Sequence, residues 1–208
     1  MINISVLVSG GGSNLQALID GIKDGRVTGA KIALVLSSKD GAYALERARN
    51  AGIDTIVVSK SSYPDEAEKA AVILKALTDA QTDLVVAAGY MSVIDKSVCK
   101  AYAGRLINIH PSLLPKHSGI GYYGLRVHKA VLESGDAETG ATVHFVDDEG
   151  IDTGDIIMQK STPVFMEDTP ESLQKRVLEE IEHPLIVEAT NLIVEKLRGD
   201  SIDNRVGS

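Results

Sequence analysis

Short apolar runs alternate with helical segments along most of this 208-residue chain, and that alternation constrains the fold more than any other feature. We expect strands at 2–9, 31–36, 53–58, 84–88, 106–110, 142–146 and 156–164. The fourth run, Leu84 to Ala88, is apolar at every position, which is typical of a parallel strand covered on both faces. The pattern therefore predicts an α/β fold with a mostly parallel central sheet and helices on both faces.

The helical segments carry their own start and stop signals. Segment 42–51 is followed by Gly52, a residue common just past a helix end, and segment 64–80 has Pro64 in its first turn. A last helix begins near Thr169 and runs to about Leu197, with an interruption at Pro184. Because we find no internal repeat and no linker, we predict a single domain over 1–198 and a loose tail over 199–208.

A polar pair stands inside the fifth apolar run, which reads LINIHPSLLP from Leu106 to Pro115. Asn108 and His110 are two residues apart, so their side chains point to the same side of a strand. Pro111 stops the run just after them, which places the pair at a carboxyl end, where open parallel sheets bind ligands. A histidine in such a place can also be a purely structural residue, so the pair by itself defines no site.

A glycine-rich loop, Gly10 to Asn14, joins the first strand to the first helix. This arrangement aims backbone N–H groups at a phosphate; the alternative is a tight turn in which Ser13 or Asn14 caps the helix. A dinucleotide is disfavoured, because Leu15 occupies the third glycine position of that fingerprint and the second strand runs into Ser37 instead of an acidic residue. The loop therefore favours a nucleotide monophosphate.

Two further loops have compositions that can indicate a function. The run TVHFV at 142–146 leads into a glycine-containing segment with four carboxylates, which is either a functional loop or a solvated turn. The segment from Lys116 to Gly124 is rich in glycine and has no periodicity. We expect it to form a mobile loop over the ligand crevice.

Composition excludes several classes of partner. The formal net charge of −8 argues against nucleic acid, whose phosphates need clustered Lys and Arg. The single cysteine, Cys99, rules out an internal disulfide and a Cys-based metal site, and we expect no metal. No signal peptide and no apolar run of about 18 residues is visible, so we expect a cytoplasmic protein without a membrane partner, either a monomer or a homodimer.

Taken together, these motifs resemble one family. NIHPSLLP at 108–115, GGGSN at 10–14 and an Asp in a glycine loop after VHFV are similar to the phosphoribosylglycinamide formyltransferases, a folate-dependent formyltransferase family of purine biosynthesis. The resemblance covers roughly residues 2–182. It implies a Rossmann-like fold and transfer of a formyl group from 10-formyltetrahydrofolate to the amine of glycinamide ribonucleotide (GAR).

The resemblance also implies residue roles. Asn108, His110 and Asp152 match the family's catalytic residues, and Glu182 matches a glutamate that holds the ribose hydroxyls, although Pro184 comes early. The substrate phosphate loop is matched by Gly12, Ser13 and Asn14. The folate pocket is matched by Met91, Ser92, Val93, Ile94, Asp147, Asp148, Glu149 and Gly150.

The chain departs from the family pattern at three places. Ser92 stands where an Arg is common, and Glu66 falls near a second folate-contacting Arg of some members. The loop before Asp152 is one residue longer than in some members, which leaves Asp147 and Asp148 as rival partners of the histidine.

The chemistry of formyl transfer suits these residue types. Attack of an amine on a formyl carbon creates an oxyanion, which an Asn side-chain N–H can stabilise. An imidazolium can donate to the oxyanion and deliver a proton, and a nearby carboxylate favours that charged form. We find no Ser-His or Cys-His pair that could act as an activated nucleophile, so we expect direct transfer through a tetrahedral intermediate.

Three rival functions remain open. A formyltransferase acting on initiator tRNA shares the SLLP element but needs a basic surface and an RNA-binding domain. A non-catalytic nucleotide-binding module would bind no folate. An NAD oxidoreductase is disfavoured by Leu15 and Ser37.

Overall fold

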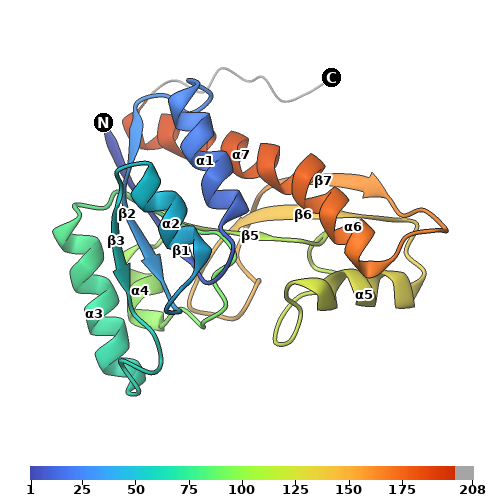
Figure 1. Ribbon diagram of the computed structural model, residues 1–208, viewed down its shortest axis with the longest axis horizontal. Helices are drawn as coiled ribbons and strands as arrows, with labels where there is room; N and C mark the ends of the chain where they lie inside the picture. Colours follow the sequence, from blue (N-terminus) through green and yellow to red (C-terminus); the bar gives the residue numbers. More distant parts are fainter. Residues whose placement is uncertain (200–208) are drawn as a thin grey trace.

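A seven-stranded sheet forms the centre of the computed structural model, which describes residues 1–199 (Figure 1). The strands are β1 (Ile2–Val8), β2 (Ala30–Ser37), β3 (Asp54–Val57), β4 (Leu84–Ala87), β5 (Leu106–His110), β6 (Glu138–Phe145) and β7 (Ile156–Pro163). The helices are α1 (Ser13–Lys23), α2 (Tyr43–Asn50), α3 (Glu66–Asp79), α4 (Lys96–Ala101), α5 (Leu125–Ser134), α6 (Pro170–Arg176), the π-helix η1 (Val177–Glu182) and α7 (His183–Arg198). The predicted tail lies outside the described residues, except for Gly199 at the end of α7.

The strand order is β3-β2-β1-β4-β5-β6-β7. Strands β1 to β5 pair in parallel, whereas β6 is antiparallel to β5 and β7 is antiparallel to β6. The predicted α/β fold with a mostly parallel sheet is therefore confirmed. The carboxyl ends of β1, β4 and β5 meet at one edge of the sheet, because these three neighbours run in the same direction.

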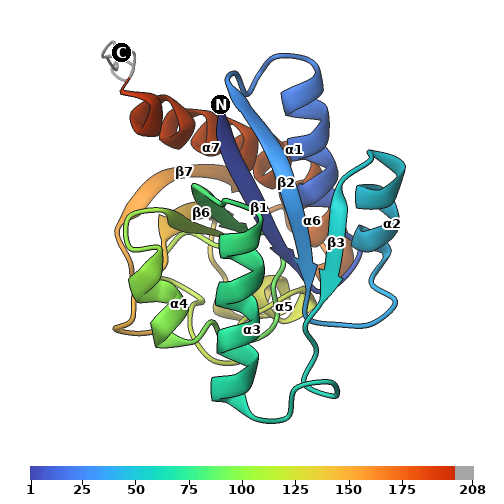
Figure 2. The same ribbon diagram turned by 90° about the vertical axis from the view of Figure 1, so that its left-hand side faces the viewer.

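Helices cover both faces of the sheet, as expected (Figure 2). Helices α1, α2 and α7 contribute to one core cluster, and α3 and α4 contribute to the other. Strand β1 serves both clusters, since Val6 and Val8 face the first and Leu7 faces the second. This alternation is the two-residue period of a strand buried on both faces.

Local capping sets several helix starts. Asp65 accepts a hydrogen bond from the Glu68 amide at 2.8 Å, so α3 begins after the aspartate and two residues later than predicted. Thr169 and Ser172 form a capping box at α6, with Pro170 in the first turn.

The last helical region is continuous through Pro184, where an interruption was predicted. Residues 177–182 form a π-helical turn, and α7 follows with Pro184 in its first turn. A proline cannot donate to the carbonyl four residues earlier, and the wider π turn ends just before it. Within residues 1–199, none of the helices is long and apolar enough to cross a bilayer.

Candidate active site

Asn108 and His110 lie on β5 between two neighbouring strands. Asn108 is in register with Ala87 of β4 and with His144 of β6, and His110 is opposite Thr142. The segment that follows β4 therefore leaves the sheet beside the polar pair. The fold thus brings the predicted catalytic pair beside the strand that leads into the acidic loop, at the edge of the sheet from which the chain continues to residues 91–94.

The two ring nitrogens of His110 have different partners. Nε2 lies 2.8 Å from the carbonyl oxygen of His117, and because a carbonyl only accepts, Nε2 carries the hydrogen. Nδ1 lies 3.5 Å from Asp152 Oδ2. In the neutral ring, Nδ1 is consequently the nitrogen with a free lone pair and the one that can take up a proton.

Asp152 stands between two imidazoles. Its Oδ2 faces His110 and accepts the Gly119 N–H at 3.0 Å, while Oδ1 lies 3.6 Å from His144 Nε2. The backbone of Asp152 has a φ of 59°, a left-handed conformation that is uncommon for residues other than glycine. Such a conformation in a loop is often associated with a functional site, and here it accompanies a carboxylate whose side chain is only 9% exposed.

The two rival carboxylates are engaged elsewhere. Asp147 accepts hydrogen bonds from the Glu149 amide and the Thr153 hydroxyl. Asp148 lies 3.4 Å from Lys100 on α4. Along the described part of the chain, Asp152 is the acidic-loop residue that pairs with His110.

Burial and neighbouring groups together determine the protonation of this pair. Burial lowers the pKa of the His110 imidazole, and the charge of Asp152 only partly offsets it. Burial also raises the pKa of the Asp152 carboxyl, but the neighbouring imidazoles of His144 and His110 and the N–H of Gly119 together bring that pKa below its ordinary value. The free chain therefore holds an ionised Asp152 beside a mainly neutral His110, which differs from the expected charged imidazole.

His144 belongs to the site, although its sequence context gave it no role. Its side chain is buried, and Nδ1 donates to the Phe145 carbonyl at 2.8 Å. Nε2 then accepts from the Asn108 Nδ2 at 3.1 Å, which leaves one N–H of that amide for another acceptor. The sequence signal was a histidine between the apolar residues Val143 and Phe145, but only the β5–β6 register shows that it faces Asn108.

The loop from Lys116 to Gly124 lies over His110. Asp136 accepts from Lys116 Nζ at 2.8 Å and pairs with His117 Nε2 at 2.7 Å, and these contacts lower the pKa of Asp136 to about 2. The Ser112 hydroxyl also donates to the Lys116 carbonyl at 2.6 Å. Together they hold the start of the loop so that the His117 carbonyl faces His110; mobility of the loop stays a prediction.

The glycine loop ends in an uncapped helix. Helix α1 follows Gly12 without any side-chain cap, so the alternative in which Ser13 or Asn14 caps it is wrong. Gly12 has a φ of 71°, and a Cβ there would lie 2.5 Å from the Ala44 Cβ. The close approach of α2 therefore requires glycine, and the free N–H groups of the first turn remain available to an anion.

The Asn14 side chain turns inward, away from the loop. Its Nδ2 donates to Glu182 Oε2 at 2.8 Å, and both residues are buried. Burial raises the pKa of Glu182 to about 6. Asn14 can serve a phosphate only through its backbone N–H in this arrangement, and a ribose role for Glu182 stays a prediction.

The two segments predicted to bind folate are residues 91–94, which follow β4, and residues 147–150 of the acidic loop, which follow β6. Met91 and Val93 are exposed, and Ser92 and Ile94 are half-buried. The Met91 N–H donates to Ser9 Oγ at 2.7 Å, which ties the segment to the end of β1. On the other side, the Asp148–Lys100 ion pair links residues 147–150 to α4. Exposed apolar side chains beside backbone polar groups suit a flat, partly apolar ligand.

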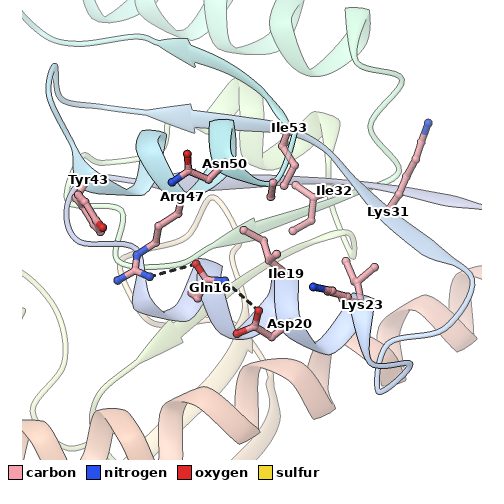
Figure 3. A pocket seen from close by; sticks show the side chains of 12 residues that line it. Gln16, Ile19, Asp20, Lys23, Lys31, Ile32, Tyr43, Arg47, Asn50 and Ile53 are labelled. Atoms are coloured by element: carbon pink, nitrogen blue, oxygen red, sulfur yellow. Dashed lines mark hydrogen bonds between the residues drawn. The ribbon is translucent and has the colours of Figure 1, made fainter.

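Two hollows lie along α1 and not over His110. One, of about 580 Å³, is bounded by α1 and α2 and has Ile19, Ile32 and Ile53 on its walls (Figure 3). The other, of about 560 Å³, extends from Ser13 and is lined by Arg47, Glu179 and His183 among others. Over residues 1–199, no group of three or more His, Cys, Asp or Glu side chains is arranged to hold a metal ion.

Comparisons with known proteins agree on one family. The sequence model described as formyl transferase matches residues 2–190. Phosphoribosylglycinamide formyltransferase of Escherichia coli strain K12 is 42% identical over 187 residues, which are 89% of this chain and 85% of that protein. The crystal structure of glycinamide ribonucleotide transformylase 1 from Symbiobacterium toebii superposes with a TM-score of 0.87 at 41% identity, covering 94% of this chain and 89% of that one.

Some relatives are much longer. The trifunctional purine biosynthetic protein adenosine-3 of Drosophila melanogaster is 45% identical over 175 residues, or 84% of this chain. The chain spans only 12% of the length of that protein.

Proposed function

We propose, from the premise that this chain belongs to the formyl transferase family, that it transfers the formyl group of 10-formyltetrahydrofolate to the amine of GAR in de novo purine biosynthesis. One observation carries the proposal. A buried imidazole offers a free Nδ1 at 3.5 Å from an ionised Asp152, and Asn108 lies two residues earlier on the same side of β5. Amine attack on a formyl carbon needs this combination of a proton acceptor and an oxyanion donor.

The proposed reaction proceeds by direct attack. The GAR amine nitrogen forms a bond to the formyl carbon, and the carbonyl electron pair becomes an oxyanion. The free N–H of the Asn108 amide donates to that oxyanion, while His144 holds the other N–H. Because the amide does not titrate, this donor is present at any ordinary pH.

The proton then moves through His110. The attacking nitrogen gives its proton to Nδ1, and the imidazolium that forms is stabilised by Asp152. The same proton passes to the folate nitrogen as its bond to the formyl carbon breaks. A neutral His110 in the free chain is suited to the first of these steps, since it must accept a proton before it can donate one.

The substrates occupy opposite sides of this pair. We place the GAR phosphate at Gly12, Ser13 and the backbone of Asn14, where α1 begins without a cap. We place the folate between Met91–Ile94 and Asp147–Gly150. Direct transfer predicts that quenched reactions contain no formylated protein; a trapped formyl-enzyme would reject this mechanism.

An assay of GAR-dependent loss of 10-formyltetrahydrofolate tests the function. We expect turnover with GAR and none with initiator tRNA as acceptor, in keeping with the net charge of −8. Turnover with the tRNA and not with GAR would make the rival formyltransferase correct. Binding of a nucleotide without any binding of folate would instead identify a non-catalytic module.

We also propose that the chain acts in the cytoplasm, as a monomer or homodimer, with no metal in its reaction. Sedimentation of the purified chain would decide between the two oligomeric states. Activity that is lost on chelation and restored by a divalent cation would overturn the last point.

A further inference from the structure

Arg47 is held at the glycine loop from several directions. It lies on α2 one turn after Ala44, the residue against which Gly12 packs. Its Nε donates to the Gly11 carbonyl at 2.8 Å, and its Nη1 donates to Gln16 Oε1 at 3.2 Å. The guanidinium carbon also lies 5.0 Å from the centre of the Tyr43 ring. Figure 3 shows the side chain reaching from α2 across to Gln16 on α1.

The contacts leave part of the guanidinium available. In the described chain, Nη2 of Arg47 makes no hydrogen bond to protein, and the residue is half-buried. Arg47 lines the 560 Å³ hollow together with Ser13, the first residue of α1. A fixed cation with free N–H groups therefore adjoins the uncapped helix start.

An anion in this hollow needs a side-chain cation. Two carboxylates, Asp20 and Glu179, line the same hollow and would repel it. Arg26 also lines the hollow, but its Nε and Nη2 are bonded to Asp24. The start of a helix contributes only about half a positive charge. Arg47 is consequently the hollow-lining cation whose charge is not already matched by a bonded carboxylate.

We propose that Arg47 supplies the side-chain charge that holds the phosphate of the ribonucleotide substrate against the glycine loop. The proposal rests on the proposed function, because it requires a phosphorylated substrate at Ser13. A guanidinium can give two parallel N–H groups to one phosphate. Since Gly11, Gln16 and Tyr43 already fix its position, little side-chain entropy is lost when the phosphate binds.

Kinetics of several variants with two substrates can distinguish phosphate binding by Arg47 from structural support of the glycine loop. The substrates are GAR and glycinamide riboside, which lacks the phosphate; the variants are R47Q, R47K and the control R49Q. Arg49 is exposed on the same helix, and its substitution changes the charge equally. We expect R47Q to lose about 10- to 100-fold in kcat/KM with GAR, the size of a hydrogen bond to a charged group. With the riboside, R47Q should match the wild type.

A conservative variant, an inhibitor and thermal melts provide further tests of the role of Arg47. R47K keeps the charge but not the fork, so we expect a smaller loss, again confined to GAR. Inhibition by ribose 5-phosphate should weaken in R47Q and stay unchanged in R49Q, which gives a readout independent of turnover. Thermal melts of each variant establish that it is folded.

The role of Arg47 and the location of the phosphate site can be refuted separately. Equal losses with GAR and the riboside would show that Arg47 only supports the loop, and an unchanged R47Q would remove it from the site altogether. If the wild-type chain itself failed to prefer GAR over the riboside, the phosphate site at the glycine loop would be wrong, and with it that part of the proposed function.

Discussion

Asp152→Asn removes one charge and little else. The asparagine oxygen can still accept the Gly119 N–H, so the loop keeps that contact. What disappears is the negative charge at 3.5 Å from His110 Nδ1 and 3.6 Å from His144 Nε2. The variant therefore isolates the electrostatic part that Asp152 plays in proton transfer.

The size of the effect follows from the distance. Two unit charges 3.5 Å apart attract by roughly 5 kcal/mol at an effective dielectric constant of about 20, and this is an upper limit. Only the imidazolium formed during the reaction feels the full attraction, so the loss falls on kcat. We expect a decrease of about 10²- to 10³-fold, equivalent to about 3–4 kcal/mol.

The pH dependence of kcat/KM provides a second, independent test of the role of Asp152. The carboxylate raises the pKa of His110 against the effect of burial, so its removal lowers that pKa further. His110 must be neutral to accept the amine proton, and the acidic limb of kcat/KM should accordingly move to lower pH.

Steady-state kinetics over the acidic to neutral range measure both quantities, with Asp155→Asn as the control. Asp155 lies three residues further along, is exposed, and undergoes the same change of charge. A near wild-type kcat for Asp152→Asn, or an acidic limb displaced to higher pH, would refute the assignment of Asp152.

Three other predictions follow from named contacts. His144→Leu deprives the Asn108 amide of its acceptor, so kcat should fall at least 10-fold while both KM values hold; unchanged kcat would contradict the role of His144. Gly12→Val places a Cβ against Ala44 in a left-handed backbone, and calorimetry should show lost GAR binding. Glu182→Gln should raise the free energy of unfolding by about 2 kcal/mol in urea melts at pH 8. The Glu182 carboxyl has a pKa of about 6 in the folded chain and 4.5 as the ordinary value, so the wild type loses stability as the pH rises through that interval. Equal melts at pH 8 would argue against a buried, ionised Glu182.

Local patterns were enough to predict most of the fold. Apolar runs and helix signals gave the seven strands and the helices that cover them, since each depends on residues close in the sequence. The direction of β6 and β7 could not be predicted, because apolar runs look alike in parallel and antiparallel strands. The π turn before Pro184 was also missed, since a proline within a helical pattern is usually read as a break.

The candidate site divides in the same way. The placement of Asn108 and His110 on the same side of one strand could be predicted from their two-residue spacing. Asp152 was named from the family resemblance alone, and the local pattern could not separate it from Asp147 and Asp148, because the direction of each carboxylate depends on the folded loop and its left-handed residue. His144 was equally hidden, since strand register decides which residue faces Asn108.

The hydrogen bond from His110 Nε2 to the His117 carbonyl makes one loop part of the acid–base chemistry. An imidazole released from that carbonyl would interconvert between two tautomers, and only one of them leaves Nδ1 empty. Displacement of the 116–124 loop would thus lower the fraction of molecules whose Nδ1 can take up a proton, while every catalytic side chain remained in place. Substitutions at Asp136, which pairs with His117, would then lower kcat through the tautomer of His110.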